Sequence, residues 1–206
     1  MKAMSLRYRL MHNHFDKHLN VKELILERQP KVLVECGGAS GENTRQILSL
    51  LEIYSFKLYT ISDAPYAEET MKLDNRYSPK EFEWIYDLSY KAMRYFRDHE
   101  IDFCSIDTDH NYWTMREELR ALHPKLKPGG LIVMHDTETY RKNSGQAYRY
   151  GTSDPYPGEE ISKYEKMGLG MGDAVCDFLD KHSEYKVIRE SLESHGAMAI
   201  EKGVEC

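Results

Sequence analysis

The sequence has no surplus of basic residues. Its 28 lysines and arginines are outnumbered by 34 aspartates and glutamates, which gives a formal net charge of -6 at pH 7. Proteins that bind nucleic acid or anionic membranes use a positive surface for the phosphates, and no basic excess is available here. We therefore expect no nucleic acid and no membrane as a partner, whereas an acidic chain is compatible with a bound divalent cation.

Cysteine pairs and long apolar runs are also missing. The four cysteines stand at positions 36, 104, 176 and 206 without a close pair, which argues against a zinc site formed by them. Cys36 and Cys104 fall in apolar segments and fit small buried hydrophobic residues in a reducing compartment. No segment has the length of a membrane span, and the first residues lack the apolar run of a signal peptide. We expect a cytoplasmic protein.

Strand and helix patterns alternate along most of the chain, and neither an internal repeat nor a second domain is evident. A length of 206 residues suits one domain, residues 1–206, with a full core. The pattern predicts an α/β fold: a Rossmann-like, doubly wound, seven-stranded, mostly parallel sheet with helices on both faces and a C-terminal antiparallel hairpin. The expected strands are 31–36, 56–61, 81–86, 101–106, 131–134, 185–189 and 197–201.

Two segments lie outside this alternation. Residues 1–30 predict an amphipathic helical segment, which could pack on a second subunit in a homo-oligomer. Residues 137–167 are rich in tyrosine and also carry prolines and glycines. A long irregular segment at the carboxyl end of a strand is typical of a lid or substrate-binding insertion, and the alternative is a loop without function.

Acidic and imidazole residues follow two neighbouring strands of the predicted sheet. Five such residues come directly after the expected strands 101–106 and 131–134: Asp107, Asp109, His110, His135 and Asp136. Polar groups just past the carboxyl ends of successive strands mark the usual site of a doubly wound sheet. We therefore predict a functional site at this edge. The alternative is that the acids cap a helix and that the His135–Asp136 pair is an ordinary hydrogen-bonded strand end.

A loop with three glycines follows the first expected strand. It has the sequence Glu35-Cys-Gly-Gly-Ala-Ser-Gly41, and a helix is expected to begin near residue 42 or 43. Glycine permits tight turns and close approach of the backbone to a ligand. Strand, loop and helix form a nucleotide-binding type of βα unit, although the Gly-x-Gly-x-x-Gly spacing of dinucleotide-binding proteins is absent. The alternative is a purely structural βα junction.

Polar residues also follow the second and third expected strands. Asp63 stands about 20 residues or slightly more beyond the glycine loop, where an acid commonly binds a ribose hydroxyl, and its alternative role is to cap a helix. Asp87 and Ser89 follow the third strand, and Ser89 can cap the next helix. Farther along, residues 114–117 have the form of a capping box, and Pro-Gly-Gly at residues 128–130 predicts a turn.

Four segments, in the order in which they occur along the chain, resemble the class I S-adenosylmethionine-dependent methyltransferases. The segments that carry the resemblance are Glu35–Gly41, Asp107-Thr-Asp-His-Asn-Tyr112, Leu126-Lys-Pro-Gly-Gly130 and His135-Asp136. The chain looks most similar to a small-molecule O-methyltransferase branch with an Asp-x-Asp-His-x-Tyr segment, related to metal-dependent sugar O-methyltransferases and cephalosporin-hydroxylase-like proteins. The resemblance covers residues 30–136. It implies S-adenosylmethionine as cofactor and a hydroxyl of a small molecule, such as a sugar, phenol or natural product, as acceptor.

The resemblance also implies roles for individual residues. The implied cofactor-binding residues are Glu35, Gly37, Gly38, Ala39, Gly41, Asp63, Asp87, Ser89 and Asp107. Acids after the fourth and fifth strands hold Mg²⁺ in metal-dependent relatives, which implies Asp107 and Asp136 as ligands, with His135 where some relatives have a second acid. Ala39 replaces a family glycine, a tolerable change if the backbone there does not need a positive φ.

Two residues are candidates for the base that takes the proton of the acceptor hydroxyl. Asp109, beside a cation, and His110, which titrates nearest neutrality, are both plausible bases, with Asp107 next to the transferred methyl group. Two other interpretations of the whole chain also remain. One is a catalytically inactive protein that keeps the cofactor-binding fold, and the other is a nicotinamide-dependent oxidoreductase, which the missing dinucleotide spacing disfavours.

Overall fold

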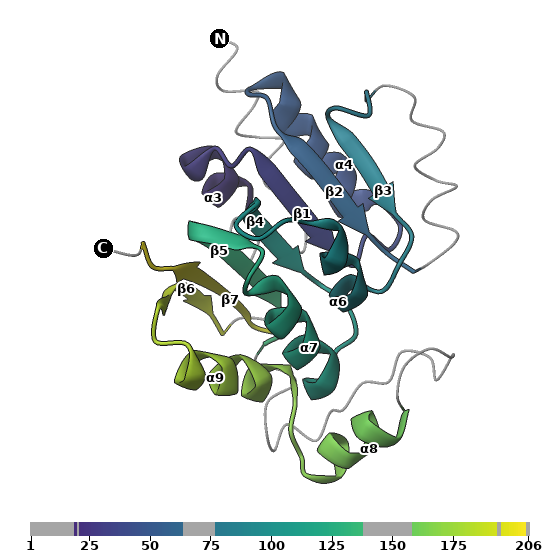
Figure 1. Ribbon diagram of the computed structural model, residues 1–206, viewed down its shortest axis with the longest axis vertical. Coiled ribbons are helices and arrows are strands. Elements are labelled where there is room, and N and C mark those ends of the chain that lie inside the picture. The colour runs from purple at the N-terminus through teal and green to yellow at the C-terminus, as the bar shows by residue number, and fades with distance from the viewer. Residues whose placement is uncertain (1–18, 20, 64–76, 138–157, 193–194, 205–206) are drawn as a thin grey trace.

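A single seven-stranded sheet forms the centre of the computed structural model, which describes residues 19, 21–63, 77–137, 158–192 and 195–204 (Figure 1). Its strands lie in the order β3-β2-β1-β4-β5-β7-β6. They are β1 (Val32–Cys36), β2 (Lys57–Ile61), β3 (Phe82–Ile85), β4 (Ile101–Ile106), β5 (Leu126–His135), β6 (Tyr185–Ser191) and β7 (Ala197–Lys202). The sheet confirms the predicted doubly wound, Rossmann-like fold, because β1 to β5 pair in parallel and β6 and β7 form the antiparallel end.

Helices cover both faces of this sheet (Figure 1). The helices are α3 (Val21–Arg28), α4 (Glu42–Leu48), α6 (Ser89–Ala92), α7 (Tyr112–Leu122), α8 (Gly158–Lys166) and α9 (Met171–Lys181), with short 3-10 turns at Ser49–Glu52 and Met93–Tyr95. Alternate side chains of each strand point to opposite faces. In β1, Val34 packs in the core under α6, α7 and α9, whereas Leu33 packs in the core under α3 and α4.

The register of the parallel strands brings their carboxyl ends to one edge. Cys36 at the end of β1 lies beside Ile61 of β2 and Ile106 of β4, and Ile106 lies beside Met134 of β5. The loops that follow these strands therefore begin side by side. This geometry places the glycine loop, the acidic segment after β4 and the His135–Asp136 pair at a common edge.

Three local expectations differ from the structure. Helix α7 begins at Tyr112 rather than near the expected capping box, because the side chain of Asn111 accepts a hydrogen bond from the amide of Thr114 at 2.9 Å. The expected turn at residues 128–130 is part of β5, which starts at Leu126 and continues after a shift in pairing with β4. Helix α8 occupies residues 158–166 of the expected irregular insertion, and residues 138–157 of it lie outside the described part of the chain.

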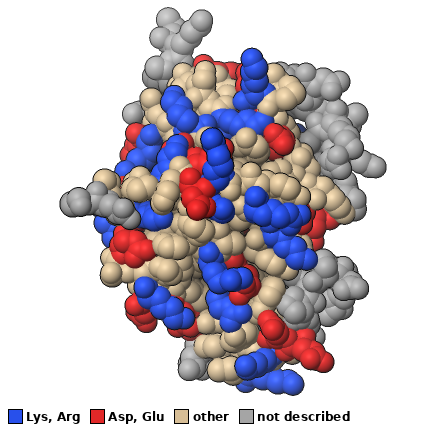
Figure 2. All heavy atoms as spheres, viewed as in Figure 1, with Lys and Arg blue, Asp and Glu red and all other residues tan. Residues whose placement is uncertain are grey.

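Charge is mixed on the surface in view. Figure 2 shows basic and acidic side chains interspersed over this face, without a zone of one sign. Within the described ranges, no helix is both long and apolar enough to span a membrane. Of the predicted N-terminal helical segment, the structure describes residue 19 and residues 21–30, which contain α3.

Candidate active site

The glycine loop is held against the segment that follows β4. The amide of Asp107 donates to the carbonyl of Cys36 at 2.9 Å, and the amide of Gly37 donates to the carbonyl of Ile61 at 2.9 Å. Gly37 has a φ of 95°, and a Cβ at this position would lie 1.8 Å from the carbonyl oxygen of Asp107. Only glycine fits such a position. The predicted cofactor loop and the predicted catalytic segment therefore touch through their backbones.

The second glycine of the loop lies against β2 and β3. A Cβ on Gly38 would lie 2.4 Å from Cγ2 of Thr60 and 2.7 Å from the ring of Trp84. The Trp84 ring thus closes one side of the loop, and its buried Nε1 has no hydrogen-bond partner among the described residues. The sequence reasoning missed Trp84, because it lies within the third strand rather than after it.

Ala39 and Gly41 both have a left-handed backbone. Gly41 has a φ of 74° directly before α4, and Ala39 has a φ of 36°. Alanine could replace the family glycine without strain only if the backbone at position 39 did not need a positive φ. The observed φ is positive, so this expectation is not met. An L-residue in this region is sterically disfavoured, so Ala39 brings strain into the loop.

Glu35 fastens the base of the loop. One carboxylate oxygen accepts from the side-chain amide of Asn43 at 2.8 Å, and the other accepts from the hydroxyls of Thr44 at 2.6 Å and Thr60 at 2.7 Å. Burial raises the pKa of Glu35, the three hydrogen bonds act against it, and the charge of Asp107 adds to the rise. Both oxygens are occupied, so in this structure Glu35 links β1, β2 and α4.

Four of the five acidic and imidazole residues converge where β4 and β5 end. Nε2 of His110 lies 2.8 Å from Oδ2 of Asp136 and 3.3 Å from Oδ1 of Asp107. Nδ1 of His135 lies 2.9 Å from the other oxygen of Asp136. Asp109 adjoins the cluster, and its carbonyl accepts from the amide of Asn111 at 2.9 Å. The residues after β4 and at the end of β5 therefore lie close together, as expected from the sequence.

Contacts within the cluster raise the pKa of both histidines. Burial disfavours the charged form of His110, but hydrogen bonds to Asp107 and Asp136 and their negative charges outweigh burial and raise its pKa to about 9. Burial would raise the pKa of Asp136, but its close contacts with the imidazoles of His110 and His135 hold it below its usual range. The pKa of His135 is raised by its close contact with the Asp136 carboxylate and by the negative charge of Asp107, despite burial. Asp136 also has a positive φ of 58°, a strained conformation of the kind that clusters at functional sites.

The same residues are suited to a divalent cation. One ligand atom from each of Asp107, His110 and Asp136 lies within 4.8 Å of the others. This set differs from the expected one, because His110 joins the two acids and His135 contacts Asp136 instead. Two carboxylates and one imidazole suit manganese, iron or zinc, whereas magnesium prefers oxygen ligands throughout.

A buried glutamate behind the cluster was missed by the sequence reasoning. Glu118 of α7 is 2% exposed and accepts hydrogen bonds from the hydroxyls of Ser89 and of Thr108, the latter at 2.7 Å. Burial raises the pKa of Glu118 to about 7, with the two hydrogen bonds acting against the rise. A signal was present, because an acid at position 118 interrupts the inward stripe formed by Met115 and Leu119.

The remaining predicted cofactor residues have other partners or lie apart. Ser89 is the first residue of α6 but makes no capping bond, so the prediction that it caps this helix is wrong; its hydroxyl bonds Glu118 instead. Asp87 accepts from the amide of Leu88 at 2.8 Å and pairs with Arg94 at 2.7 Å. Asp63 is exposed, two residues beyond the end of β2.

Comparison with known sequences identifies a family. Residues 34–137, which are 104 of the 206 residues, match the family described as a methyltransferase domain. No protein of curated function matches the chain in sequence. The matched segment contains the glycine loop and the whole cluster at the ends of β4 and β5.

Solved structures share the fold at low sequence identity. The SAH-bound methyltransferase PaMTH1 from Podospora anserina is 15% identical with a TM-score of 0.64, over 88% of this chain and 76% of that one. A protein from Staphylococcus aureus, provisionally assigned as a caffeoyl-CoA O-methyltransferase, is 18% identical with a TM-score of 0.63, over 89% and 81%. The N-methyltransferase NodS from Bradyrhizobium japonicum is 13% identical with a TM-score of 0.58, over 89% and 92%. These similarities show the fold.

Proposed function

The chain belongs to this methyltransferase domain family, and from that premise we propose that it transfers the methyl group of S-adenosylmethionine to a hydroxyl oxygen of a small molecule. The observation that carries the proposal is the cluster of Asp107, His110 and Asp136, joined to the glycine loop through the contact of Gly37 with Asp107. Methyl transfer from a sulfonium is an in-line displacement that needs a positioned acceptor and a group to take its proton. The assignment of the Staphylococcus aureus neighbour supports an oxygen acceptor.

The loop between β1 and α4 suits this cofactor chemically. S-adenosylmethionine carries no phosphate, and residues 35–41 contain no lysine or arginine that would bind one. Asp63 is exposed at the adjacent edge of β2, where an acid can bind the ribose hydroxyls. We place the methionine part of the cofactor along Gly37 and Gly38, so that its methyl group faces Asp107.

The side chains of the cluster differ in solvent exposure, and this difference supports different roles for them. The side chain of Asp107 is 39% exposed, whereas that of His110 is 16% exposed and that of Asp136 is 9% exposed. Asp107 is thus the member that an acceptor can reach. Because the pKa of His110 is about 9, this imidazole is already protonated at neutral pH and cannot accept a further proton. We therefore assign the proton to a carboxylate, that of Asp107 or Asp109, and assign to His110 the orientation of the acids.

A divalent cation is compatible with this arrangement. Asp107, His110 and Asp136 would hold the ion, with His110 then in its neutral form. When bound, the ion would act as a Lewis acid that lowers the pKa of the acceptor hydroxyl. Because one ligand is an imidazole, we expect Mn²⁺ to support activity at least as well as Mg²⁺.

The test separates cofactor binding from transfer. Calorimetric titration with S-adenosylmethionine and SAH is followed by an assay for SAH formation with hydroxylated acceptors (sugars, phenols and catechols), each with Mn²⁺, with Mg²⁺ and with chelator. We expect Asp107→Asn and Asp136→Asn to lower transfer at least a hundredfold and to change cofactor affinity less than threefold, because the cofactor contacts lie mainly in the glycine loop.

A matched control is Asp98→Asn, which makes the same chemical change in an exposed acid that pairs with Lys125 at 2.7 Å. This variant should methylate as the unmodified chain does. Normal transfer by the Asp107 and Asp136 variants would overturn the site assignment. Cofactor binding without transfer to any acceptor would instead favour an inactive cofactor-binding protein, and absence of cofactor binding would overturn the function.

A further inference from the structure

A second group of metal-binding side chains lies at the opposite edge of the sheet. His123 directly follows α7, His182 directly follows α9, and Glu184 directly precedes β6. The ammonium group of Lys202 donates to the carbonyls of His123 at 2.9 Å and of Leu126, the first residue of β5, at 3.1 Å. The ten residues of β5 span about 30 Å before His135 at the other edge, so the two groups are separate sites.

The distances in this group match those between ligands of a tetrahedral metal ion. Oε1 of Glu184 lies 3.3 Å from Nδ1 of His182 and 3.7 Å from Nδ1 of His123. Ligand atoms bound to zinc at its usual bond lengths are roughly 3.3–3.5 Å apart in a tetrahedron. One ligand atom from each of the three residues lies within 4.8 Å of the others, so small side-chain movements would complete the geometry.

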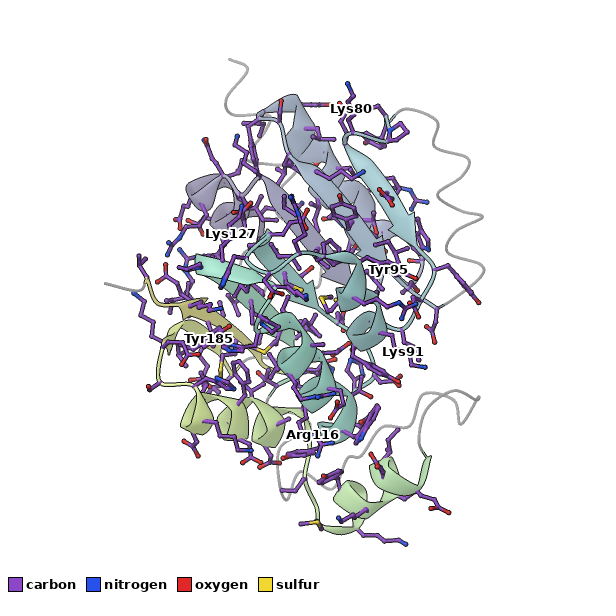
Figure 3. All side chains as sticks on the ribbon, in the orientation of Figure 1. Lys80, Lys91, Tyr95, Arg116, Lys127 and Tyr185 are labelled. Carbon is purple, nitrogen blue, oxygen red and sulfur yellow. The ribbon has the colours of Figure 1, made fainter. Side chains whose placement is uncertain are left out.

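Packing already orients both imidazole rings. The rings of His123 and His182 have their centroids 4.3 Å apart, and the ring of Phe178 lies 4.4 Å from that of His182. Figure 3 places Tyr185 between the β6–β7 hairpin and α9, and its hydroxyl lies 3.2 Å from Nδ1 of His123. A metal ion at Nδ1 would replace this hydrogen bond. Ligands that neighbouring side chains hold in place bind a metal with less loss of conformational freedom.

The exposure and charge of these residues suit metal binding. The side chains of His123, His182 and Glu184 are 29%, 30% and 40% exposed, which leaves an ion accessible from solvent. Lys202 is held by two carbonyls, and the carboxylate of Glu184 supplies the negative charge that a dication requires.

We propose that His123, His182 and Glu184 form a binding site for a divalent transition-metal ion, with zinc as the expected ion and water in its fourth position. Two imidazoles and one carboxylate are a typical zinc ligand set, and magnesium would not be bound by them. The ion would fasten the ends of α7 and α9 to the start of β6. The site is independent of methyl transfer, because its ligands lie at the edge opposite Asp107 and Asp136.

The experiment titrates metal-stripped full-length protein with Zn²⁺ by calorimetry, and with Co²⁺ by visible absorption. The Asp136→Asn background removes a ligand of the other cluster. In that background we expect one Zn²⁺ to bind per chain, with no response to Mg²⁺ at this site. Further substitution His182→Ala or Glu184→Gln should weaken Zn²⁺ binding at least tenfold and abolish the intense tetrahedral Co²⁺ bands.

The matched control is His195→Ala, the same change at an exposed histidine in the β6–β7 connection. It should leave Zn²⁺ binding unchanged. Zinc at about a hundred times its dissociation constant should also raise the melting temperature by about 5–11 °C, and the His182 and Glu184 variants should lose this shift. Loss of all Zn²⁺ binding on Asp136→Asn alone, or unchanged binding in the His182 and Glu184 variants, would overturn the proposal. Neither result bears on methyl transfer.

Discussion

Nε2 of His110 lies 2.8 Å from Oδ2 of Asp136 and joins the end of β5 to the loop after β4. Protonation of His110 is therefore linked to the stability of the fold, because the pKa of His110 is about 9 in the folded protein against an ordinary value of about 6.5. A raised histidine pKa stabilises the fold fully below pH 6.5, and this stabilisation is lost as the pH rises through 9.

The first prediction concerns this window. In the presence of chelator, the free energy of unfolding should fall by about 3 kcal/mol between pH 6.5 and pH 9 through His110 alone. Denaturant unfolding of His110→Asn should lack this part of the decline, whereas the exposed-site control His195→Asn should retain it. Parallel pH profiles for the two variants would show that His110 is not held protonated by the acids.

The second prediction concerns Glu118, whose pKa of about 7 exceeds the ordinary 4.5 because of burial. A carboxyl that holds its proton more tightly in the fold destabilises the fold as the pH rises from about 4.5 to about 7, by about 3 kcal/mol in total. Glu118→Gln keeps an acceptor for Ser89 and Thr108 but cannot ionise. It should therefore be more stable than the unmodified chain at pH 8 and about equal to it at pH 4.5.

Thermal unfolding over this pH range provides the measurement for Glu118. Glu83→Gln is a control, because the carboxylate of Glu83 is half exposed and pairs with Lys57 at the surface. This control should leave the pH profile almost unchanged. If Glu118→Gln followed the same profile as the control, the carboxyl of Glu118 would have an ordinary pKa despite its burial.

The third prediction concerns Gly37. Alanine there would place Cβ 1.8 Å from the carbonyl oxygen of Asp107, with φ at 95°. The backbones of the loop and of residue 107 would have to separate, so we expect a loss of at least about 3 kcal/mol and loss of cofactor binding. Gly168→Ala is the matched control, since φ is 70° there but nothing lies within 4 Å of the added Cβ. The control should cost about 1 kcal/mol, and equal losses would refute a steric origin.

The sequence predicted the edge of the sheet at which the site lies, because this depends on local patterns. Apolar runs end at Cys36 and Ile106, and parallel pairing places the following residues side by side. The partners within the site depend instead on contacts between distant segments. His110, from the loop after β4, contacts both acids, whereas His135 contacts Asp136, and the sequence pattern does not distinguish these two arrangements. The pairing of Ser89 with Glu118 spans 29 positions, and no local pattern indicates it.

Ala39 gives the fourth prediction, in which a substitution should improve the fold. Its φ of 36° is disfavoured for a residue with a Cβ, and glycine can adopt it freely. Ala39→Gly should therefore raise the free energy of unfolding by up to about 1 kcal/mol, although glycine is more flexible in the unfolded chain. The same substitution at Ala174, buried inside α9, should instead destabilise by about 1 kcal/mol or more. Chemical denaturation measures whether each substitution raises or lowers the free energy of unfolding. A loss of stability in Ala39→Gly would mean that the loop gains more from the rigidity of alanine than it loses to strain.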